Sequence, residues 1–250
     1  MARRYARRRR APAEPVTMEI ESLSHEGRGI ARPGGKVTFV DGALAGETIV
    51  GQVVGGRSQF DEAVVKEILE KSVDRVDPPC QFAHICGGCS LQHMNSEAQL
   101  LFKQDVLLEK MQHATGLSQD EYEVLPHISS STTHYRRKAR LAVRDVKKKG
   151  AVLVGFREKQ GTFITVMDTC WVLHQSAAKL IKPLQTLLLA MDCRQQVPQI
   201  EVAVGETQPN GSAGDELNAR VALIFRHLVT LTEADTEKLH ELSRQWQLDI

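Results

Sequence analysis

Four cysteines at two distant points of the chain constrain its fold more than any other feature. Three of them, Cys80, Cys86 and Cys89, follow the spacing C-x5-C-x2-C, and Cys170 lies 81 residues further on. Four thiolates can hold a tetrahedral zinc ion or an iron–sulfur cluster. The spacing leaves three possibilities open: a [4Fe–4S] cluster, a structural zinc ion, and free or disulfide-bonded thiols.

Two glycines, Gly87 and Gly88, lie between the second and third cysteines. Because they lack a Cβ atom, the backbone can approach a bulky inorganic group and direct N–H groups at the sulfurs. Zinc ribbons usually pair two C-x2-C turns, and this segment contains one. His84 and His93 could join a mixed site, but four cysteines complete a tetrahedral set. We therefore interpret both histidines as loop or helix-cap residues.

The composition is that of an ordinary globular protein, with 250 residues of which 42% are hydrophobic and 25% charged. We find neither an apolar run long enough to cross a membrane nor the apolar segment of a secretory signal. We therefore expect a cytoplasmic protein without a membrane partner. In that reducing compartment, clustered cysteines bind metal more often than they form disulfides.

Residues 1–15 are predicted to form a disordered basic arm, because six of the first ten residues are Arg and none is acidic. The arm either contacts RNA phosphates through counterion release or is a solvated tail.

Residues 16–75 are predicted to form a small β-barrel of about five strands, because alternating β-branched segments are separated by glycine-rich turns. The predicted strands include 16–20, 36–40, 47–54 and 62–68. Small barrels commonly bind oligonucleotides. The candidate phosphate contacts are Arg28, Arg32, Lys36 and Arg57. Alternatively, these residues are solvated charges at strand edges.

Residues 76–250 are predicted to form an α+β domain around the cysteines. A connecting helix should span 96–114, with Ser96 as its N-cap and Gly116 as its stop. Two further helices are expected at 176–191, interrupted by Pro183, and from Thr232 to Trp246. The expected strands are 139–143, 152–157, 163–166, 200–204 and 219–225.

A second basic block covers residues 134–149, where alternation predicts a strand with its cations on one face. Tyr135 adjoins that face, a combination that favours an RNA-binding sheet. The candidate RNA contacts are Arg136, Arg137, Lys138 and Arg140. The alternative is an ordinary antiparallel sheet with a charged solvent face.

The predicted fold class is therefore mainly β with α+β: an OB-like barrel followed by an α+β metal-binding domain. We find neither a G-x-G-x-x-G motif nor a P-loop, so no nucleotide or methyl-donor site is visible. Cys193 is the fifth cysteine, and no base lies near it in the sequence. We interpret it as a small buried residue rather than a nucleophile.

Three features together resemble the bacterial RNA (uracil-5-)-methyltransferases: the cysteine segment continuing to Gln92 and His93, the preceding barrel, and the Tyr135–Lys138 stretch. Within that family, the likeness is to enzymes that act on 23S ribosomal RNA, and the barrel is similar to their TRAM domain. The resemblance implies S-adenosylmethionine-dependent methylation of a uracil C5, a 23S rRNA partner, no DNA partner and a monomer.

The resemblance also implies a [4Fe–4S] cluster, whose ligands would be Cys80, Cys86, Cys89 and Cys170. In the family, a Rossmann-like methyltransferase domain follows the cluster domain, and we expect it to be absent from this chain. The chain would then bind cluster and RNA without methylating. Two other hypotheses stay open, a redox iron–sulfur protein and a zinc-stabilised RNA-binding adaptor.

Overall fold

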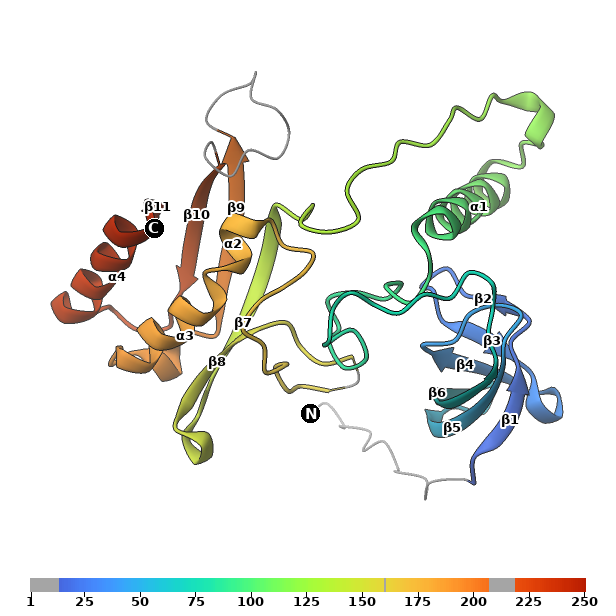
Figure 1. Cartoon of the computed structure of the whole chain (residues 1–250), viewed down its shortest axis with the longest axis horizontal. Helices are drawn as coiled ribbons and strands as arrows, with labels where there is room; N and C mark the ends of the chain where they lie inside the picture. Colours follow the sequence, from blue (N-terminus) through green and yellow to red (C-terminus); the bar gives the residue numbers. More distant parts are fainter. Residues whose placement is uncertain (1–13, 160, 207–218) are drawn as a thin grey trace, which may run out of the picture. The chain divides into compact units, whose positions relative to one another are not determined.

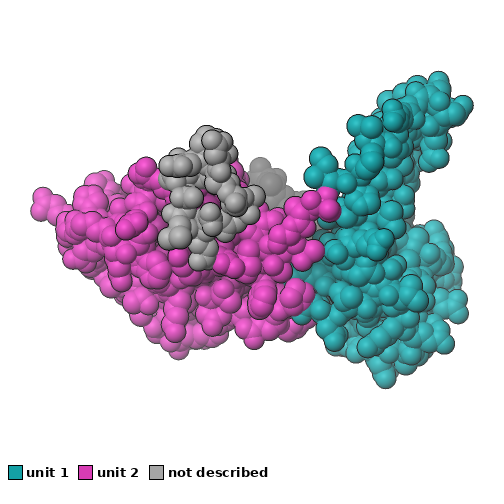
Figure 2. All heavy atoms as spheres, turned by 45° about the horizontal axis from the view of Figure 1, so that its top comes forward, with its two compact units in different colours: residues 1–78, 90–128 teal, residues 79–89, 129–250 magenta. Residues whose placement is uncertain are grey.

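The computed structural model describes residues 14–159, 161–206 and 219–250 (Figure 1). Residues 1–13 of the predicted basic arm and most of the loop 205–218 lie outside this part of the chain. The chain divides into two compact units (Figure 2). Unit 1 comprises residues 1–78 and 90–128, and unit 2 comprises 79–89 and 129–250. The cysteine segment therefore belongs with the later part of the chain.

Unit 1 is built on a six-stranded sheet with the order β1-β5-β6-β4-β3-β2. Its strands are β1 Val16–Glu19, β2 Ser22–Leu23, β3 Gly29–Ala31, β4 Val37–Asp41, β5 Thr48–Gly56 and β6 Phe60–Glu70. A short 3-10 turn at Pro33–Gly35 leads into β4. The alternation that predicted these strands points Met18, Val40 and Ile49 into one small core.

The sheet of unit 1 pairs its strands in mixed directions. Strand β4 pairs with β6 in parallel, whereas the other neighbours are antiparallel. The two strands at the ends of the order, β1 and β2, are separated by only two residues. The Ile20 N–H donates to the Glu47 carbonyl and the Glu21 N–H donates to the Ile30 carbonyl, so this segment bonds to both sides of the sheet, which is compatible with the predicted barrel. Alternation identified the strands one at a time but carried no information on which strands pair or in which direction.

Helix α1, Ser96–Thr115, follows in unit 1. The Asn95 side chain accepts a hydrogen bond of 2.8 Å from the Ala98 N–H, so Asn95 is the N-cap and Ser96 is the first helical residue. Gly116 ends the helix with φ of 75°, as predicted. A second 3-10 turn, Gln119–Glu121, lies beyond it.

A buried ion pair supports the core of unit 1. The Glu47 carboxylate, 1% exposed, accepts hydrogen bonds from Arg75, one of them 2.8 Å long from Nη2. The same Nη2 also donates to the Gly42 carbonyl at 2.7 Å. Burial raises the pKa of Glu47, but hydrogen bonds from Arg75 and the Leu44 N–H outweigh burial and hold the pKa below its usual value of 4.5.

Unit 2 is built on a five-stranded sheet with the order β11-β10-β9-β7-β8. The strands are β7 Lys138–Val146, β8 Ala151–Gly155, β9 Gln199–Glu206, β10 Ala219–Arg226 and β11 Leu248–Asp249. Its α-helices are α2 Gln175–Ala178, α3 Ile181–Ala190 and α4 Glu233–Trp246. The 3-10 turns are Lys147–Lys149 and Arg194–Gln196. Only the pair of β10 and β11 is parallel among the described pairs of this sheet.

One face of this sheet packs against the helices in a single hydrophobic core (Figure 1). Leu141 and Ile200 lie opposite each other on β7 and β9, and both are fully buried. The predicted helix 176–191 is divided into α2 and α3, with Pro183 in the first turn of α3, where it is tolerated. The predicted strand 163–166 forms only one isolated bridge, between Ile164 and Arg157.

In the part of the chain that the structure describes, no helix combines the length and the apolar composition that a membrane span requires.

We expect Arg75→Ala to lower the free energy of unfolding by about 3–5 kcal/mol, because it leaves a buried carboxylate without its charged partner. Since folding lowers the pKa of Glu47, the pair stabilises the protein above pH 4.5 and this contribution is lost as the pH falls below that value. Urea unfolding at neutral and acidic pH measures both effects.

The matched control for this prediction is Arg32→Ala, which removes the exposed ion pair with Glu21. We expect it to change the free energy of unfolding by less than about 1 kcal/mol. Equal losses from Arg75→Ala and Arg32→Ala would contradict the role given to the buried pair.

Candidate functional site

The cysteine segment of unit 2 is fastened to residues 157–159 by backbone pairing. Cys86 forms an isolated antiparallel bridge with Glu158. The Gly87 N–H donates to the Arg157 carbonyl at 2.8 Å, and the Lys159 N–H donates to the Ile85 carbonyl at 2.9 Å. These bonds place the cysteine segment on residues that lie about seventy positions later in the sequence.

The two glycines permit a close approach in this segment. A Cβ atom on Gly87 would lie 2.9 Å from the Arg157 carbonyl oxygen, the same atom that accepts its hydrogen bond. A Cβ atom on Gly88 would lie 3.2 Å from the Phe156 ring and 3.4 Å from Cys86 Sγ. The Gly88 N–H lies 3.4 Å from the same sulfur and donates to it. Glycine is therefore required for space at Gly87, whereas a Cβ atom at Gly88 would make a tight contact with the Phe156 ring.

Cys170 lies in the same unit, 5% exposed, in a segment that pairs with residues 134–136. Burial raises the pKa of its thiol, and the N–H groups of Leu173 and Val172 act against that shift. The negative charges of Cys89 and Cys86 raise the pKa further, as expected of neighbouring sulfurs. The fold thus brings Cys170 near two cysteines of the early segment.

Cys80 is 8% exposed in unit 2, where its carbonyl accepts a 3.0 Å hydrogen bond from the Ala83 N–H. All five cysteines are free thiols. His84 is exposed, and His93 is buried in unit 1. Neither histidine is needed to complete a set of four sulfurs.

Among the described residues, no three His, Cys, Asp or Glu side chains converge as the ligands of one metal ion would. A zinc ion with Zn–S bonds of about 2.3 Å holds its sulfurs about 3.8 Å apart. The cysteines of an iron–sulfur cluster bind different iron atoms and therefore lie further apart. The donor set of thiols, glycines and sulfur-directed N–H groups is chemically suited to a metal group bound by thiolates.

Arg136 contacts the cysteine segment directly. Its Nη1 donates to the Gly88 carbonyl at 3.2 Å, and its guanidinium carbon lies 5.8 Å from the centre of the Phe156 ring. The structure thus gives this predicted RNA contact a role in holding the segment. Arg137 is half-buried, and its carbonyl accepts a 2.8 Å bond from the Val204 N–H.

Lys138 and Arg140 project from β7 on the face opposite the hydrophobic core. Both are exposed, whereas Leu141 and Val143 are buried, as the alternation predicted. Arg140 lies opposite Glu201 of β9, and that carboxylate accepts hydrogen bonds from Arg226. The two β7 cations therefore stand on an open sheet face.

In unit 1, three of the four candidate phosphate contacts gather around two aromatic rings, and we name this group the Phe39–Phe60 cluster. The rings meet edge to face at 5.5 Å. Arg28 lies 4.7 Å from the Phe39 ring centre and Arg57 lies 5.8 Å from that of Phe60. Lys36 donates to the Arg57 carbonyl at 2.9 Å. These five residues place cations and aromatic faces together.

Some of these candidate cations already form ion pairs within unit 1. Arg32 lies outside the cluster, where it forms an exposed ion pair with Glu21. Lys36 also pairs with Asp61 at 2.8 Å, and Arg28 with Glu26 at 2.8 Å. The two phenylalanines were missed from the sequence, although each follows a candidate cation by three residues. That spacing was the available signal.

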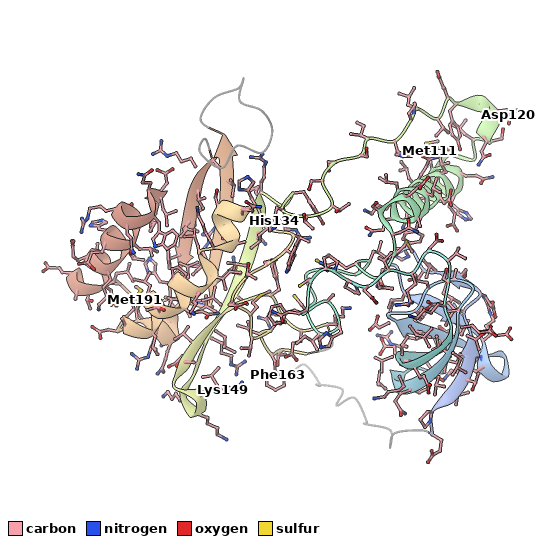
Figure 3. All side chains as sticks on the ribbon, viewed as in Figure 1. Met111, Asp120, His134, Lys149, Phe163 and Met191 are labelled. Atoms are coloured by element: carbon pink, nitrogen blue, oxygen red, sulfur yellow. The ribbon has the colours of Figure 1, made fainter. Side chains whose placement is uncertain are left out.

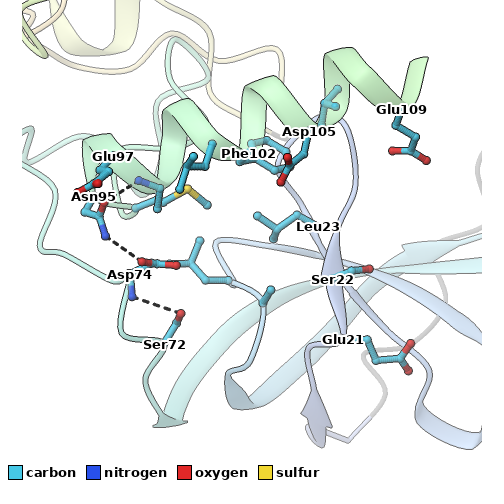
Figure 4. Close-up of a pocket in the computed structure, with 16 residues that line it drawn as sticks. Glu21, Ser22, Leu23, Ser72, Asp74, Asn95, Glu97, Phe102, Asp105 and Glu109 are labelled. Atoms are coloured by element: carbon cyan, nitrogen blue, oxygen red, sulfur yellow. Dashed lines mark hydrogen bonds between the residues drawn. The ribbon is translucent and has the colours of Figure 1, made fainter. Parts of the chain in front are cut away.

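A hollow of about 520 Å³ in unit 1 lies along α1 (Figure 4). The carboxylates that line it are Glu21, Asp74, Glu97, Asp105 and Glu109. The described residues lining it include no Lys or Arg. Because carboxylates repel phosphates, this hollow is unsuited to a nucleic acid.

Cys193 is 7% exposed, and burial together with a hydrogen bond to Asp235 raises the pKa of its thiol to about 11. A thiol with this pKa is protonated at neutral pH and is a poor nucleophile. The interpretation of Cys193 as a small buried residue agrees with this environment.

In fold, the chain is similar to the tRNA (uracil-54, C5)-methyltransferase of Pyrococcus abyssi, solved in complex with S-adenosyl-L-homocysteine. The TM-score is 0.58 at 21% sequence identity, over 89% of this chain and 48% of that chain. This match overturns the fold class predicted above, in which methyltransferase architecture was absent from the chain. The prediction relied on the lack of a glycine-rich turn in the sequence, which is a local feature. The match depends instead on the course of the backbone over most of the chain.

In sequence, the chain is similar to proteins named 23S rRNA (uracil(1939)-C(5))-methyltransferase RlmD. It is 43% identical to that of Hahella chejuensis over 98% of this chain and 52% of the relative. It is 45% identical to that of Alcanivorax borkumensis over 93% of this chain and 49% of the relative. The chain spans about half the length of the curated relatives it matches. No family model matches the chain.

We expect Gly87→Ala to destabilise unit 2 by about 1–3 kcal/mol, because the new methyl group would press on a backbone oxygen that cannot move freely. Thermal unfolding measures the loss, and a thiol reagent should modify Cys86 faster in the variant. The control is Gly205→Ala, where a Cβ atom meets nothing within 4 Å. If both variants unfold alike, the close approach at Gly87 has no energetic consequence.

Proposed function

We propose that this chain provides the RNA-binding and cluster-binding portion of an S-adenosylmethionine-dependent enzyme that methylates C5 of a uracil in 23S ribosomal RNA. The observation that carries the proposal is the 43% identity over 98% of the chain to a relative with that printed activity. The fold likeness to a methyltransferase bound to S-adenosyl-L-homocysteine supports the same reaction class.

The proposed reaction forms a carbon–carbon bond at an unactivated position of the base. A cysteine thiolate adds to C6 of the uracil, and the electron density that develops at C5 attacks the methyl carbon of S-adenosylmethionine. S-Adenosylhomocysteine leaves, a base removes the C5 proton, and the thiolate is expelled. We do not assign the nucleophile to Cys193, since its thiol is buried and its pKa is about 11.

We further propose that the four cysteines bind a [4Fe–4S] cluster. The location of Cys170 in the same unit as the segment 79–89 supports this assignment. So do the N–H groups of Gly88, Val172 and Leu173, which donate to cysteine sulfurs and would stabilise bound thiolates. Methyl transfer moves no electron to or from the protein, so a cluster here would be structural, joining two distant parts of the chain.

For RNA, the proposal uses both units. The Phe39–Phe60 cluster offers aromatic rings and cations, which suit bases and phosphates. Lys138 and Arg140 offer exposed charge on an open sheet face. Arg136 is better described as a positioning residue, because its guanidinium is engaged with the cysteine segment.

The function is tested with the full chain and a 23S rRNA fragment that contains the uracil methylated by the relatives. We expect the chain to bind this fragment more tightly than a scrambled RNA of equal length, and 5-methyluridine to form at that uracil in the enzyme that carries the chain. Equal affinity for both RNAs, with methylation at another base, would refute the proposal.

Cys170→Ser should abolish the iron and sulfide that the protein retains through anaerobic purification. The three remaining cysteines all come from one segment, and the cluster would lose its fourth ligand and its only attachment to the later part of the chain. Cys193→Ala should keep both elements at the wild-type level, since Cys193 lies outside the proposed ligand set. Elemental analysis and cluster absorbance measure the difference. Full iron content in Cys170→Ser would show that the ligand assignment is wrong.

Replacing Lys138 and Arg140 together by Gln should weaken RNA binding and lower the slope of log affinity against log salt by about 1.4, or 0.7 for each phosphate contact. Lys182→Gln, an exposed change in α3, should leave the slope unchanged. Filter binding over a range of salt concentrations gives both slopes. An unaltered slope in the double variant would mean that this face is only solvated.

A further inference from the structure

A hollow of about 940 Å³ lies in unit 2 beside the turn that joins β7 and β8. This volume is within the range of ligand-binding clefts. The basic residues that line it are Arg144, Lys147, Lys148, Lys149 and Arg194. Asp145 and Glu158 are the acidic residues among those lining it. The hollow therefore carries a positive excess, although the whole chain is nearly neutral, with a net charge of +1.

The charges of the hollow are arranged unevenly. The Asp145 side chain is 8% exposed and its carboxylate lies 3.5 Å from Arg194, so the buried acid neutralises one of the cations. The three consecutive lysines occupy the exposed 3-10 turn between β7 and β8. Four cations are left to face a ligand, against the single carboxylate of Glu158. Such a surface attracts a polyanion.

An exposed aromatic ring completes the hollow. Phe163 is 67% exposed and lines the hollow together with Val166, which is 56% exposed. Figure 3 shows Phe163 and Lys149 on the part of unit 2 that carries the β7–β8 turn. An exposed aromatic face beside lysines is the usual platform for an unstacked nucleic-acid base. A phosphate alone would gain nothing from the ring.

The residues that present Phe163 are held on both sides. The Glu158 N–H donates to the Phe163 carbonyl at 3.0 Å, and the Thr165 N–H donates to the Phe156 carbonyl at 2.9 Å. Arg157 and Glu158, which bond to residues 163–164, also pair with Gly87 and Cys86. The cysteine segment thus holds the residues that bond to the backbone of Phe163. A ring on a backbone held in this way loses less freedom on binding than one on an unsupported loop.

We propose that this hollow is a second RNA site, which takes one unpaired nucleotide of the RNA. Its base stacks on Phe163, and the flanking phosphates lie against Arg144 and the lysines of the turn. The inference rests on the proposed function for the identity of the polyanion. It adds a site for single-stranded RNA, because the base faces of a duplex are already stacked and cannot use the ring.

The test uses the full chain with a short single-stranded RNA and a blunt duplex of the same sequence. Phe163→Ala should weaken single-strand binding about thirtyfold, the middle of the range for loss of one stacked base, with no change for the duplex. Phe163→Trp should restore the affinity, and single-stranded RNA should quench the fluorescence of the new indole. Equal weakening for strand and duplex would overturn the stacking role.

The lysines are tested by Lys148→Gln with Lys149→Gln, which should lower the salt slope by about 1.4 for single-stranded RNA. The matched control is Lys179→Gln with Lys182→Gln, two exposed lysines at the start of α3 and just before it, and its slope should not change. Poly-glutamate should compete poorly with the RNA. Competition as strong as that of unlabelled RNA would overturn the assignment to RNA in favour of an acidic protein partner.

The two proposals fail in distinguishable ways. If the wild-type chain binds the 23S rRNA fragment while the Phe163 and lysine variants keep wild-type affinity for single strands, the hollow is not an RNA site and the proposed function stands. If the wild-type chain binds neither RNA, the proposed function is refuted together with this site.

Discussion

Backbone pairing between the cysteine segment and residues 157–159 is the interaction on which the organisation of unit 2 depends. It is short, consisting of one bridge and the hydrogen bonds of Gly87 and Lys159, yet it joins parts of the chain that are far apart in sequence. A pairing this short gains little from β-structure alone. Its stability must come from what surrounds it, namely the Phe156 ring, Arg136 and the buried thiols.

Sequence reasoning located most strands and helices of the fold, because alternation and capping are local signals. Gly116 and Thr232 ended and began their helices as predicted. Sequence reasoning failed where a structural feature depends on residues that are distant in the sequence. The parallel pair of β4 and β6 has no local signature, and the choice of Asn95 over Ser96 as N-cap depends on a single side-chain hydrogen bond. The fold class failed for the same reason, since strand pairing and the full backbone path are non-local.

The candidate site shows the same division. The cysteines could be proposed as metal ligands from spacing and chemistry alone, because few residue types bind metal and their clustering is visible in a linear sequence; that assignment stays a prediction. The aromatic residues could not. Phe39 and Phe60 meet only because β4 pairs with β6, and Phe163 lines one hollow with the lysines only because its segment lies near the β7–β8 turn in the fold of unit 2. An aromatic residue in a sequence is by default a core residue, and exposure is a tertiary property.

The basic block 136–149 illustrates why charge in a sequence cannot be assigned to one task. The Arg136 guanidinium contacts the Gly88 carbonyl and the Phe156 ring. Lys138 and Arg140, which follow on strand β7, are exposed to solvent. The lysines at its far end line the hollow that holds Phe163. One run of cations therefore both holds the cysteine segment and supplies the charge of the proposed RNA surface. A change in the cysteine segment would act on that proposed surface through Arg136 and residues 157–159, without any cysteine touching RNA.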